Sequence, residues 1–274
     1  MREIHFKKII EYLLAGLPYL RITVAYVAAS LFFGFLIGIV IAKLNMSKHK
    51  LPRILGHLYI TLTRCTPPLV LLFLTYYGLP TVLRNSGFKI GKVEPLAFVC
   101  LTFSIFVGSS SSEIIRSAIK VVGNSQKEAA VAVGLSDFQA FRIIILPQVF
   151  KVALPNIGNT IIYLFKEGSL AYTIGLHDVL GHVLFTASGE RNLYLLEAYL
   201  ALTVIYWPIS VLIQKLFASF EKKMQYKRRT TEKDSKKEKA VKSVKEIKEV
   251  KEVKEKERKE KDENRLGLRT RSIS

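Results

Sequence analysis

Long apolar runs constrain this chain more than any other feature. Residues 22–42 form an uncharged run of 21 residues, which as an α-helix would be roughly 31 Å long. That length is enough to cross the hydrocarbon core of a bilayer, and four further apolar segments approach it. The sequence therefore predicts an all-α membrane protein with five transmembrane helices, at about residues 20–42, 65–83, 95–115, 152–174 and 193–216.

Charge divides the chain into a membrane part and a tail. The net charge is +19, and residues 221–274 contribute 21 basic and 12 acidic residues to it. In the tail an apolar residue recurs every third position, so the apolar stripe spirals around a helix and forms no coiled-coil seam. We expect an N-terminal extracytoplasmic segment at 1–18, a transmembrane domain at 19–217, and a Lys/Glu-rich cytoplasmic tail at 218–274 that is disordered or loosely helical.

The distribution of basic residues predicts the orientation in the membrane. Basic connections at 43–53, at 116–151 and after residue 215 mark the cytoplasmic side, because cytoplasmic loops carry an excess of Lys and Arg. The N-terminus would then be outside and the C-terminus inside, although Lys7, Lys8 and Arg21 count against this. The charge of the body thus indicates topology rather than a nucleic-acid partner. The basic start of the tail could touch membrane lipid, but a solvated extension is the simpler interpretation.

The loop at 120–148 differs from the apolar runs around it, because it mixes charged and small residues. Its central part reads EAAVAVGLSDFQAFRIIILP at 128–147. A first helix at 127–133 would end where Gly134 accepts a left-handed backbone. A second helix, from 137 to about 145, would begin with Ser136 or Asp137 as its N-cap and stop near Pro147. We therefore expect a helix–turn–helix that protrudes between two spans and that another protein can approach closely.

The spacing in this loop resembles the EAA signature of permease subunits of ABC importers. That signature, EAA-x3-G-x9-I-x-LP, is matched at each of its fixed positions. In that family the loop is the cytoplasmic coupling helix, which docks into a groove of the ATP-hydrolysing subunit. The resemblance implies that the coupling residues here are Glu128, Ala129, Ala130, Gly134, Leu135, Ile144, Leu146 and Pro147.

Two further stretches resemble the polar amino-acid branch of that family, which includes histidine, glutamine and arginine permeases. They are TPPLVLLFLTYYGLP at 66–80, preceded by Cys65 where glycine is usual, and PNIGNTIIYLFKEGSLAYTIGL at 155–176. The resemblance covers about residues 15–220. It implies a type I ABC importer permease of a bacterial inner membrane, which moves a polar amino acid by alternating access. It also implies three partners: ABC ATPase subunits, an external solute-binding protein, and a second copy or a homologous permease.

Several polar residues in or near the spans are candidates for a translocation path or its gate. Ionisable groups inside a membrane are costly and normally face a bundle interior or a watery path. Glu113 could instead simply pair with Arg116 one turn away. Lys166 and Glu167 are adjacent and so cannot share a helical face, which means that each needs another partner; they could also only fasten helices together. The candidates are Ser112, Glu113, Asn159, Lys166, Glu167 and Ser169.

Other chemistry is weakly supported. The stretch from Gly87 to Lys92 is one residue short of a phosphate loop, and Val93 replaces the Ser or Thr that would hold magnesium. His177 and His182, at i and i+5, do not share a helical face, so we expect no metal site. We expect no catalytic residue and no cofactor in this chain, since the resemblance assigns ATP and magnesium to the partner ATPase. The chain is then a transport subunit and not an enzyme.

Two other classes of function stay open from the residues alone. A channel or receptor-like membrane protein could bind a regulatory partner on the 120–148 loop, and it would need no nucleotide. A membrane enzyme is a weaker choice, because no span carries paired carboxylates, a Ser/Lys pair or a histidine metal site. Gly34 and Gly38, a small-xxx-small pair in the first span, could allow close helix contact. We interpret that pair as simple packing.

Overall fold

The computed structural model describes residues 4–88, 91, 93–123 and 125–223. It divides the chain into a compact unit at Met1–Glu221 and a second unit at Lys222–Ser274. Most of the second unit, and with it most of the tail predicted at 218–274, lies outside the described residues. Within the described part the regular structure is helical throughout, as an all-α prediction requires.

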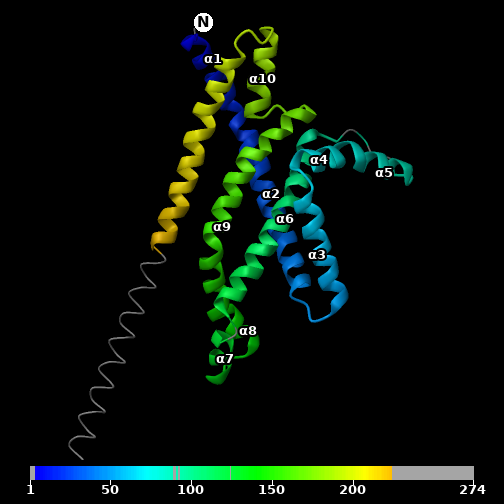
Figure 1. Cartoon of the computed structure of the whole chain (residues 1–274), viewed down its shortest axis with the longest axis vertical. Coiled ribbons are helices and arrows are strands. Elements are labelled where there is room, and N and C mark those ends of the chain that lie inside the picture. Colours follow the sequence, from blue (N-terminus) through cyan, green and yellow to red (C-terminus); the bar gives the residue numbers. More distant parts are fainter. Residues whose placement is uncertain (1–3, 89–90, 92, 124, 224–274) are drawn as a thin grey trace, which may run out of the picture. The chain divides into compact units, whose positions relative to one another are not determined.

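The helices have the following bounds. They are α1 (Phe6–Gly16), η1 (Leu17–Tyr19), α2 (Leu20–Asn45), α3 (Lys50–Cys65), α4 (Pro68–Phe73), η2 (Leu74–Gly78), α5 (Leu79–Asn85), α6 (Pro95–Val122), α7 (Ser125–Ala132), α8 (Asp137–Gln139), η3 (Ala140–Ile145), α9 (Leu146–Glu167), η4 (Gly168–Ile174) and α10 (Val179–Gly189), followed by a final helix at Leu195–Lys223 (Figure 1).

Up to five helical segments could cross a membrane. Four do so by length and composition: Phe6–Asn45, Pro95–Val122, Asp137–Ile174 and Leu195–Lys223. The fifth is a broken pair, in which Lys50–Cys65 and Pro68–Asn85 meet at 107°. The number agrees with the five predicted spans, but the second of them is bent.

Glycines bring α2 and α6 into close contact. A Cβ atom on Gly34 would overlap Val107 and lie 3.0 Å from the Ser104 carbonyl oxygen, and one on Gly38 would lie 3.2 Å from the Gly108 carbonyl oxygen. Small residues allow this approach in membrane proteins, where helices gain little from hydrophobic burial against each other. The interpretation of the glycine pair as packing within the chain is confirmed.

The break in the second span follows from its prolines. Thr66 is extended, with ψ at 125°, because the residue before a proline avoids the helical region. Pro68 begins α4, where its missing N–H costs least. The first half of the bent pair is the 16-residue α3, which lies along α2 and α6. The predicted span at 65–83 therefore corresponds mainly to the second half of the bent pair.

The helix stop that the sequence predicted near Pro147 is absent from the structure. The second helix of the loop was expected to stop near Pro147, yet it continues into a helix that spans Asp137–Ile174. The wide π-turn η3 precedes Pro147, and there the Leu146 N–H donates to the Phe141 carbonyl oxygen. This turn lets the ring enter at the first turn of α9, where no intrahelical N–H is required. Pro155 likewise lies inside α9 without ending it.

The N-terminal segment is more regular than the sequence indicated. Glycine and proline commonly interrupt helices, and Gly16 and Pro18 would predict a break before the membrane. Instead, α1, η1 and α2 form one helical stretch at Phe6–Asn45. Tyr12 of α1 is buried against α10 and the final helix, and its hydroxyl donates to Glu190 at 2.9 Å. Lys8 also binds Glu190, at 2.7 Å. These contacts hold the first helix against the connection between the last two spans.

Asp178 is a buried carboxylate at the start of α10. Its Oδ1 accepts the Gly181 N–H at 2.8 Å and so caps the helix. Burial raises the pKa of Asp178 to about 6, and the N–H donors of the cap oppose that rise. The hydroxyls of Tyr26 and Tyr206 come from α2 and the final helix and are also buried. One acidic side chain thus lies where three helices meet.

Substituting Gly34 tests the α2–α6 contact. We expect Gly34→Ala to lower the free energy of unfolding by about 1–3 kcal/mol, because the added methyl group overpacks a filled interface. The matched control is Gly78→Ala, since nothing lies within 4 Å of the added Cβ there. Thermal unfolding in detergent measures both variants. A Gly34→Ala protein as stable as the Gly78→Ala protein would contradict the contact.

Asp178 gives a pH-dependent stability. Its pKa is higher folded than unfolded, so the folded state binds the proton more tightly and this group's contribution to stability falls as pH rises from about 4 to 6. Asp178→Asn keeps an N-cap side chain and removes the charge. We expect it to stabilise the protein at pH 7 by about 2 kcal/mol and to have little effect below pH 4. Unfolding curves at several pH values decide this; an equal effect of the substitution at pH 4 and pH 7 would refute it.

Candidate functional site

The turn of the 120–148 loop is organised around Gly134. The Leu135 N–H donates to the Ala130 carbonyl oxygen at 3.1 Å, and the Gly134 N–H donates to the Val131 carbonyl oxygen at 2.9 Å. These two bonds and a φ of +91° at Gly134 form a Schellman motif, which satisfies the last carbonyl groups of α7. The prediction that the first helix ends at a left-handed Gly134 is confirmed.

The second arm of the loop begins with a capping box. The Ser136 hydroxyl accepts the Gln139 N–H at 3.3 Å, and the Gln139 side chain accepts the Ser136 N–H at 2.9 Å. Ser136, rather than Asp137, is therefore the N-cap. Asp137 instead lies 3.2 Å from the Lys127 ammonium group, which connects the two arms. We call residues 125–147 the hairpin.

The predicted coupling residues lie on this hairpin with different exposures. Ala130 is buried under the turn, and Leu135 and Ile144 are half-buried. The exposed ones are Glu128, Ala129, Gly134, Leu146 and Pro147. Ala130 therefore packs inside the protein, whereas the exposed residues can meet another molecule.

Sequence reasoning missed the apolar residues at the tip of the hairpin. Val133 is 79% exposed and Phe138 is 70% exposed, and they lie on either side of the Gly134 turn. The available signal was two large apolar residues beside a helix stop and a helix start, where turns are usually polar. An exposed apolar group at such a tip is typical of a surface that binds another protein.

Glu113 and Arg116 form an ion pair on α6. The Arg116 Nη2 donates to Glu113 Oε2 at 2.8 Å, and its Nε donates to Oε1 at 3.1 Å. Both side chains are partly exposed, so the pair is the simple i,i+3 pairing that the sequence left open. Ser112 is buried and donates to the Ser109 carbonyl oxygen at 2.8 Å. Its hydroxyl is therefore occupied within its own helix.

The other path candidates lie on α9 and η4. Asn159 and Lys166 are exposed, whereas Glu167 and Ser169 are half-buried. The Ser169 hydroxyl donates to the Lys166 carbonyl oxygen at 2.6 Å. Among the described residues no acidic group lies within 4 Å of Lys166 and no basic group within 4 Å of Glu167, so the partners expected for them are not found there. No described hydrogen bond or ion pair joins these four residues to Ser112 or Glu113.

His177, His182 and the stretch from Gly87 to Lys92 are the residues that the sequence singled out for metal or nucleotide chemistry. The described residues contain no group of three His, Cys, Asp or Glu side chains that could hold a metal ion. His182 stacks on Tyr19 with ring centroids 3.7 Å apart, and burial lowers the pKa of His182. Lys92, part of the rejected phosphate-loop pattern, lies outside the described residues. His182 therefore has a packing role.

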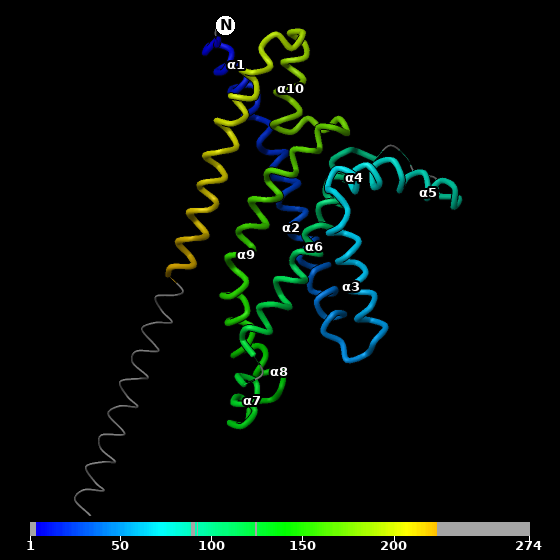
Figure 2. The backbone as a smooth tube through the Cα atoms, in the orientation of Figure 1, coloured from blue at the N-terminus to red at the C-terminus, as the bar shows by residue number. Residues whose placement is uncertain are grey.

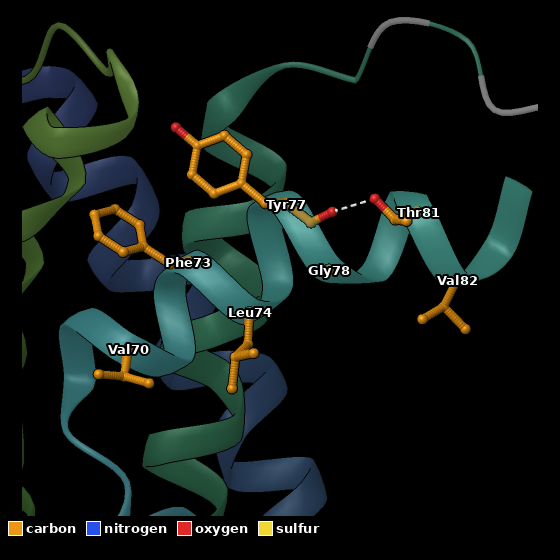
Figure 3. A pocket seen from close by; sticks show the side chains of 7 residues that line it. All are labelled: Val70, Phe73, Leu74, Tyr77, Gly78, Thr81 and Val82. Carbon is orange, nitrogen blue, oxygen red and sulfur yellow. Dashed lines mark hydrogen bonds between the residues drawn. The ribbon is translucent and has the colours of Figure 1, made fainter.

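A surface pocket of about 510 Å³ lies along the bent second span (Figure 3). Its lining residues are Val70, Phe73, Leu74, Tyr77, Gly78, Thr81 and Val82. The Thr81 hydroxyl donates to the Tyr77 carbonyl oxygen at 2.7 Å and so is unavailable as a donor to a ligand. Apart from the Tyr77 hydroxyl, the lining side chains offer a polar solute little to bind, so we do not place the path at this pocket.

Known proteins match the chain over most of its length. The family model for the binding-protein-dependent transport system inner membrane component matches residues 34–226. The L-cystine transport system permease protein TcyL of Bacillus subtilis (strain 168) is 35% identical over 209 residues, which are 76% of this chain and 86% of TcyL. The probable amino-acid ABC transporter permease protein PatM of Vibrio harveyi is 33% identical over 211 residues, 77% of this chain and 92% of PatM.

Solved structures agree with these relatives. The crystal structure of an amino acid ABC transporter with histidines has a TM-score of 0.70 and 28% identity, and the match covers 81% of this chain and 100% of that chain. The inward-facing MetNI methionine ABC transporter has a TM-score of 0.57 at 19% identity, covering 76% of this chain and 95% of that one, and so supports the fold alone. The chain belongs to the family of inner membrane components of binding-protein-dependent transport systems, as a permease subunit of an ABC importer.

Proposed function

We propose that this permease moves a polar amino acid, delivered by a solute-binding protein, into the cytoplasm of a bacterium. The observation that carries the proposal is the hairpin, whose exposed tip fits the docking of a separate ATPase subunit. The names of the relatives, which include cystine and other amino-acid permeases, support the class of solute. ATP and magnesium would be bound by the ATPase, and a second permease, identical or homologous, would complete the transporter.

Helical continuity supports a direct mechanical connection. The second arm of the hairpin and α9 belong to one helix, Asp137–Ile174 (Figure 2). A displacement of the hairpin would therefore move the membrane span itself, without an intervening flexible joint. The first arm joins α6 through Gly123, which has a φ of +75° and can act as a pivot. Closure of the ATPase dimer would thus turn α9 relative to α6.

Alternating access requires contacts that differ between two states. A partner that bound both states equally would shift neither, however tightly it bound. We propose that the ATPase grips the hairpin in both states and that its closure favours the outward-open arrangement of the spans; hydrolysis then restores the inward-open one. The exposed Val133 and Phe138 would supply apolar contact area for this grip.

The proposal for the translocation path starts from the high free-energy cost of placing a charged side chain in a membrane. Lys166 is exposed at the end of α9, roughly 30 Å along the helix from Leu146. A cation there without a carboxylate within 4 Å in the described chain fits a watery path or a second subunit better than lipid. We propose Asn159, Lys166, Glu167 and Ser169 as a gate on this side, and the partly exposed Glu113 and the neighbouring Ser112 as part of the path nearer the hairpin.

The hairpin is tested with two substitutions. Gly134→Pro forbids the positive φ of the turn, and Glu128→Lys reverses an exposed charge. We expect either to reduce substrate-stimulated ATPase activity of the reconstituted transporter to its basal rate while membrane insertion stays normal. The matched control is Glu94→Lys, which makes the same charge change before α6 and should keep stimulation. Normal stimulation in both hairpin variants would refute the coupling role.

The orientation is tested by chemical labelling. In a background of Cys65→Ser and Cys100→Ser, Val133→Cys should react with an impermeant maleimide only after cells are permeabilised, because the hairpin would face the cytoplasm. Leu193→Cys, at the other end of the spans and 59% exposed, should react in intact cells. Reaction of Val133→Cys in intact cells would reverse the proposed topology.

A channel or receptor with a regulatory partner on the loop is not favoured by the family relationship. It predicts solute flux in vesicles that contain the permease and no ATPase. Uptake that depends on both the ATPase and ATP separates the two functions.

A further inference from the structure

A continuous segment of the chain, residues 12–93, carries no acidic residue. Between Glu11 and Glu94 there is no Asp or Glu, although nine Lys and Arg residues occur there. Four of them lie where α2 meets α3: Lys43 in the last turn of α2, Lys48 in the connection, and Lys50 and Arg53 in the first turn of α3. These cations have no carboxylate near them in the sequence that could neutralise them. We call residues 43–53 the basic turn.

The basic turn is held in a defined conformation. The Arg53 guanidinium donates to the Ser47 carbonyl oxygen twice, at 2.9 and 3.3 Å. The His49 N–H donates to the Ser47 hydroxyl at 3.2 Å, and the Ser47 N–H donates to the Leu44 carbonyl oxygen at 3.1 Å. The turn is therefore built around Ser47, and its lysines project from a fixed backbone.

The lysines of the basic turn point away from the rest of the described chain. Lys43, Lys48 and Lys50 are all exposed, and no described carboxylate lies within 4 Å of any of their ammonium groups. A concentration of unneutralised positive charge at the end of two membrane helices attracts anionic groups at the bilayer surface.

An exposed apolar stripe begins at the same place. Along α3 the residues Leu51, Ile54, Leu55, Leu58 and Leu62 are each at least 51% exposed. The opposite face of α3 is buried, with Gly56 against Asn45 of α2. From Leu51 to Leu62 the stripe is roughly 17 Å long, comparable to one lipid acyl chain in half a bilayer.

We propose that the basic turn and the stripe of α3 together bind an anionic phospholipid, with the phosphate at Lys43, Lys48 and Lys50 and an acyl chain along Leu51–Leu62. A neutral phospholipid would satisfy the stripe but gain little from the three lysines. A second copy that used the same face in a twofold dimer would bring two sets of unneutralised lysines together. An anionic lipid neutralises the turn and covers the stripe at once. This site does not depend on the transported solute.

Fluorescence quenching tests the site directly. Trp207 is the single tryptophan of the chain, so Trp207→Phe gives a background without one, to which Leu51→Trp adds a reporter beside the turn. The full-length permease is reconstituted in symmetric vesicles with brominated phosphatidylglycerol or brominated phosphatidylcholine. Symmetric vesicles make the result independent of which leaflet faces the turn.

We expect the Leu51→Trp reporter to favour phosphatidylglycerol by about fivefold, since one lysine near a membrane surface attracts anionic lipid with roughly that strength. Adding Lys43→Gln, Lys48→Gln and Lys50→Gln should lower the preference to near one, as should high salt for the unaltered turn. The control reporter is Val204→Trp on the final helix, where the Val204 side chain is 50% exposed. It should show no preference between the two lipids.

Three outcomes would overturn the proposal. Equal quenching by both lipids would show that the turn does not select charge. A preference that survives the triple lysine substitution would place its origin elsewhere. Absence of quenching by either lipid at position 51, together with normal quenching at position 204, would show that protein, such as a second copy, covers the stripe.

Discussion

The continuity of one helix from the hairpin into the membrane is the constraint on which the structure depends. Inside a bilayer every backbone polar group needs a partner within the protein, so a span cannot simply be broken and left open. Pro147 could interrupt this helix, because proline has no N–H to donate. The π-turn η3 keeps the helix continuous there, through the hydrogen bond from the Leu146 N–H to the Phe141 carbonyl oxygen. An exposed loop and a buried span thereby become a single rigid element.

Rigidity in that element is useful only if the neighbouring helices stay together as it moves. Gly34 and Gly38 let α2 approach α6 until side chain meets backbone, and dense packing of this kind changes between discrete arrangements rather than deforming gradually. At the opposite end, Gly168 lies against the Tyr26 ring, where α9 gives way to η4. These close contacts join α2 to α6 and to the end of α9, and none of the three lies in the hairpin, which fits a framework that carries one mobile arm.

The sequence predicted those features that local chemistry decides alone. Gly134 and Ser136 are examples, since a left-handed turn and a capping box depend on a few neighbouring residues. The length of an apolar run likewise settles that a span exists. The error at Pro147 has a physical cause: this proline was interpreted as a helix stop, as it would be in water. In a membrane the alternatives to a helix cost more, and a π-turn or a first-turn position accommodates the ring. Side-chain partners such as Glu190 for Tyr12 required the fold, because they are 178 residues apart.

Some charged side chains form an ion pair within the described chain, and others have no oppositely charged group near them there. Glu113 is neutralised by Arg116 on its own helix, and Lys8 by Glu190 across the fold. Lys166 and the three lysines of the basic turn have no described carboxylate within 4 Å. A cation near a membrane without a partner in its own chain needs water, lipid or another subunit. The basic turn and Lys166 differ in the side chains around them. An apolar stripe adjoins the basic turn and favours lipid, whereas half-buried polar groups adjoin Lys166 and favour water or solute. Surroundings, rather than charge alone, separate a lipid contact from a transport path.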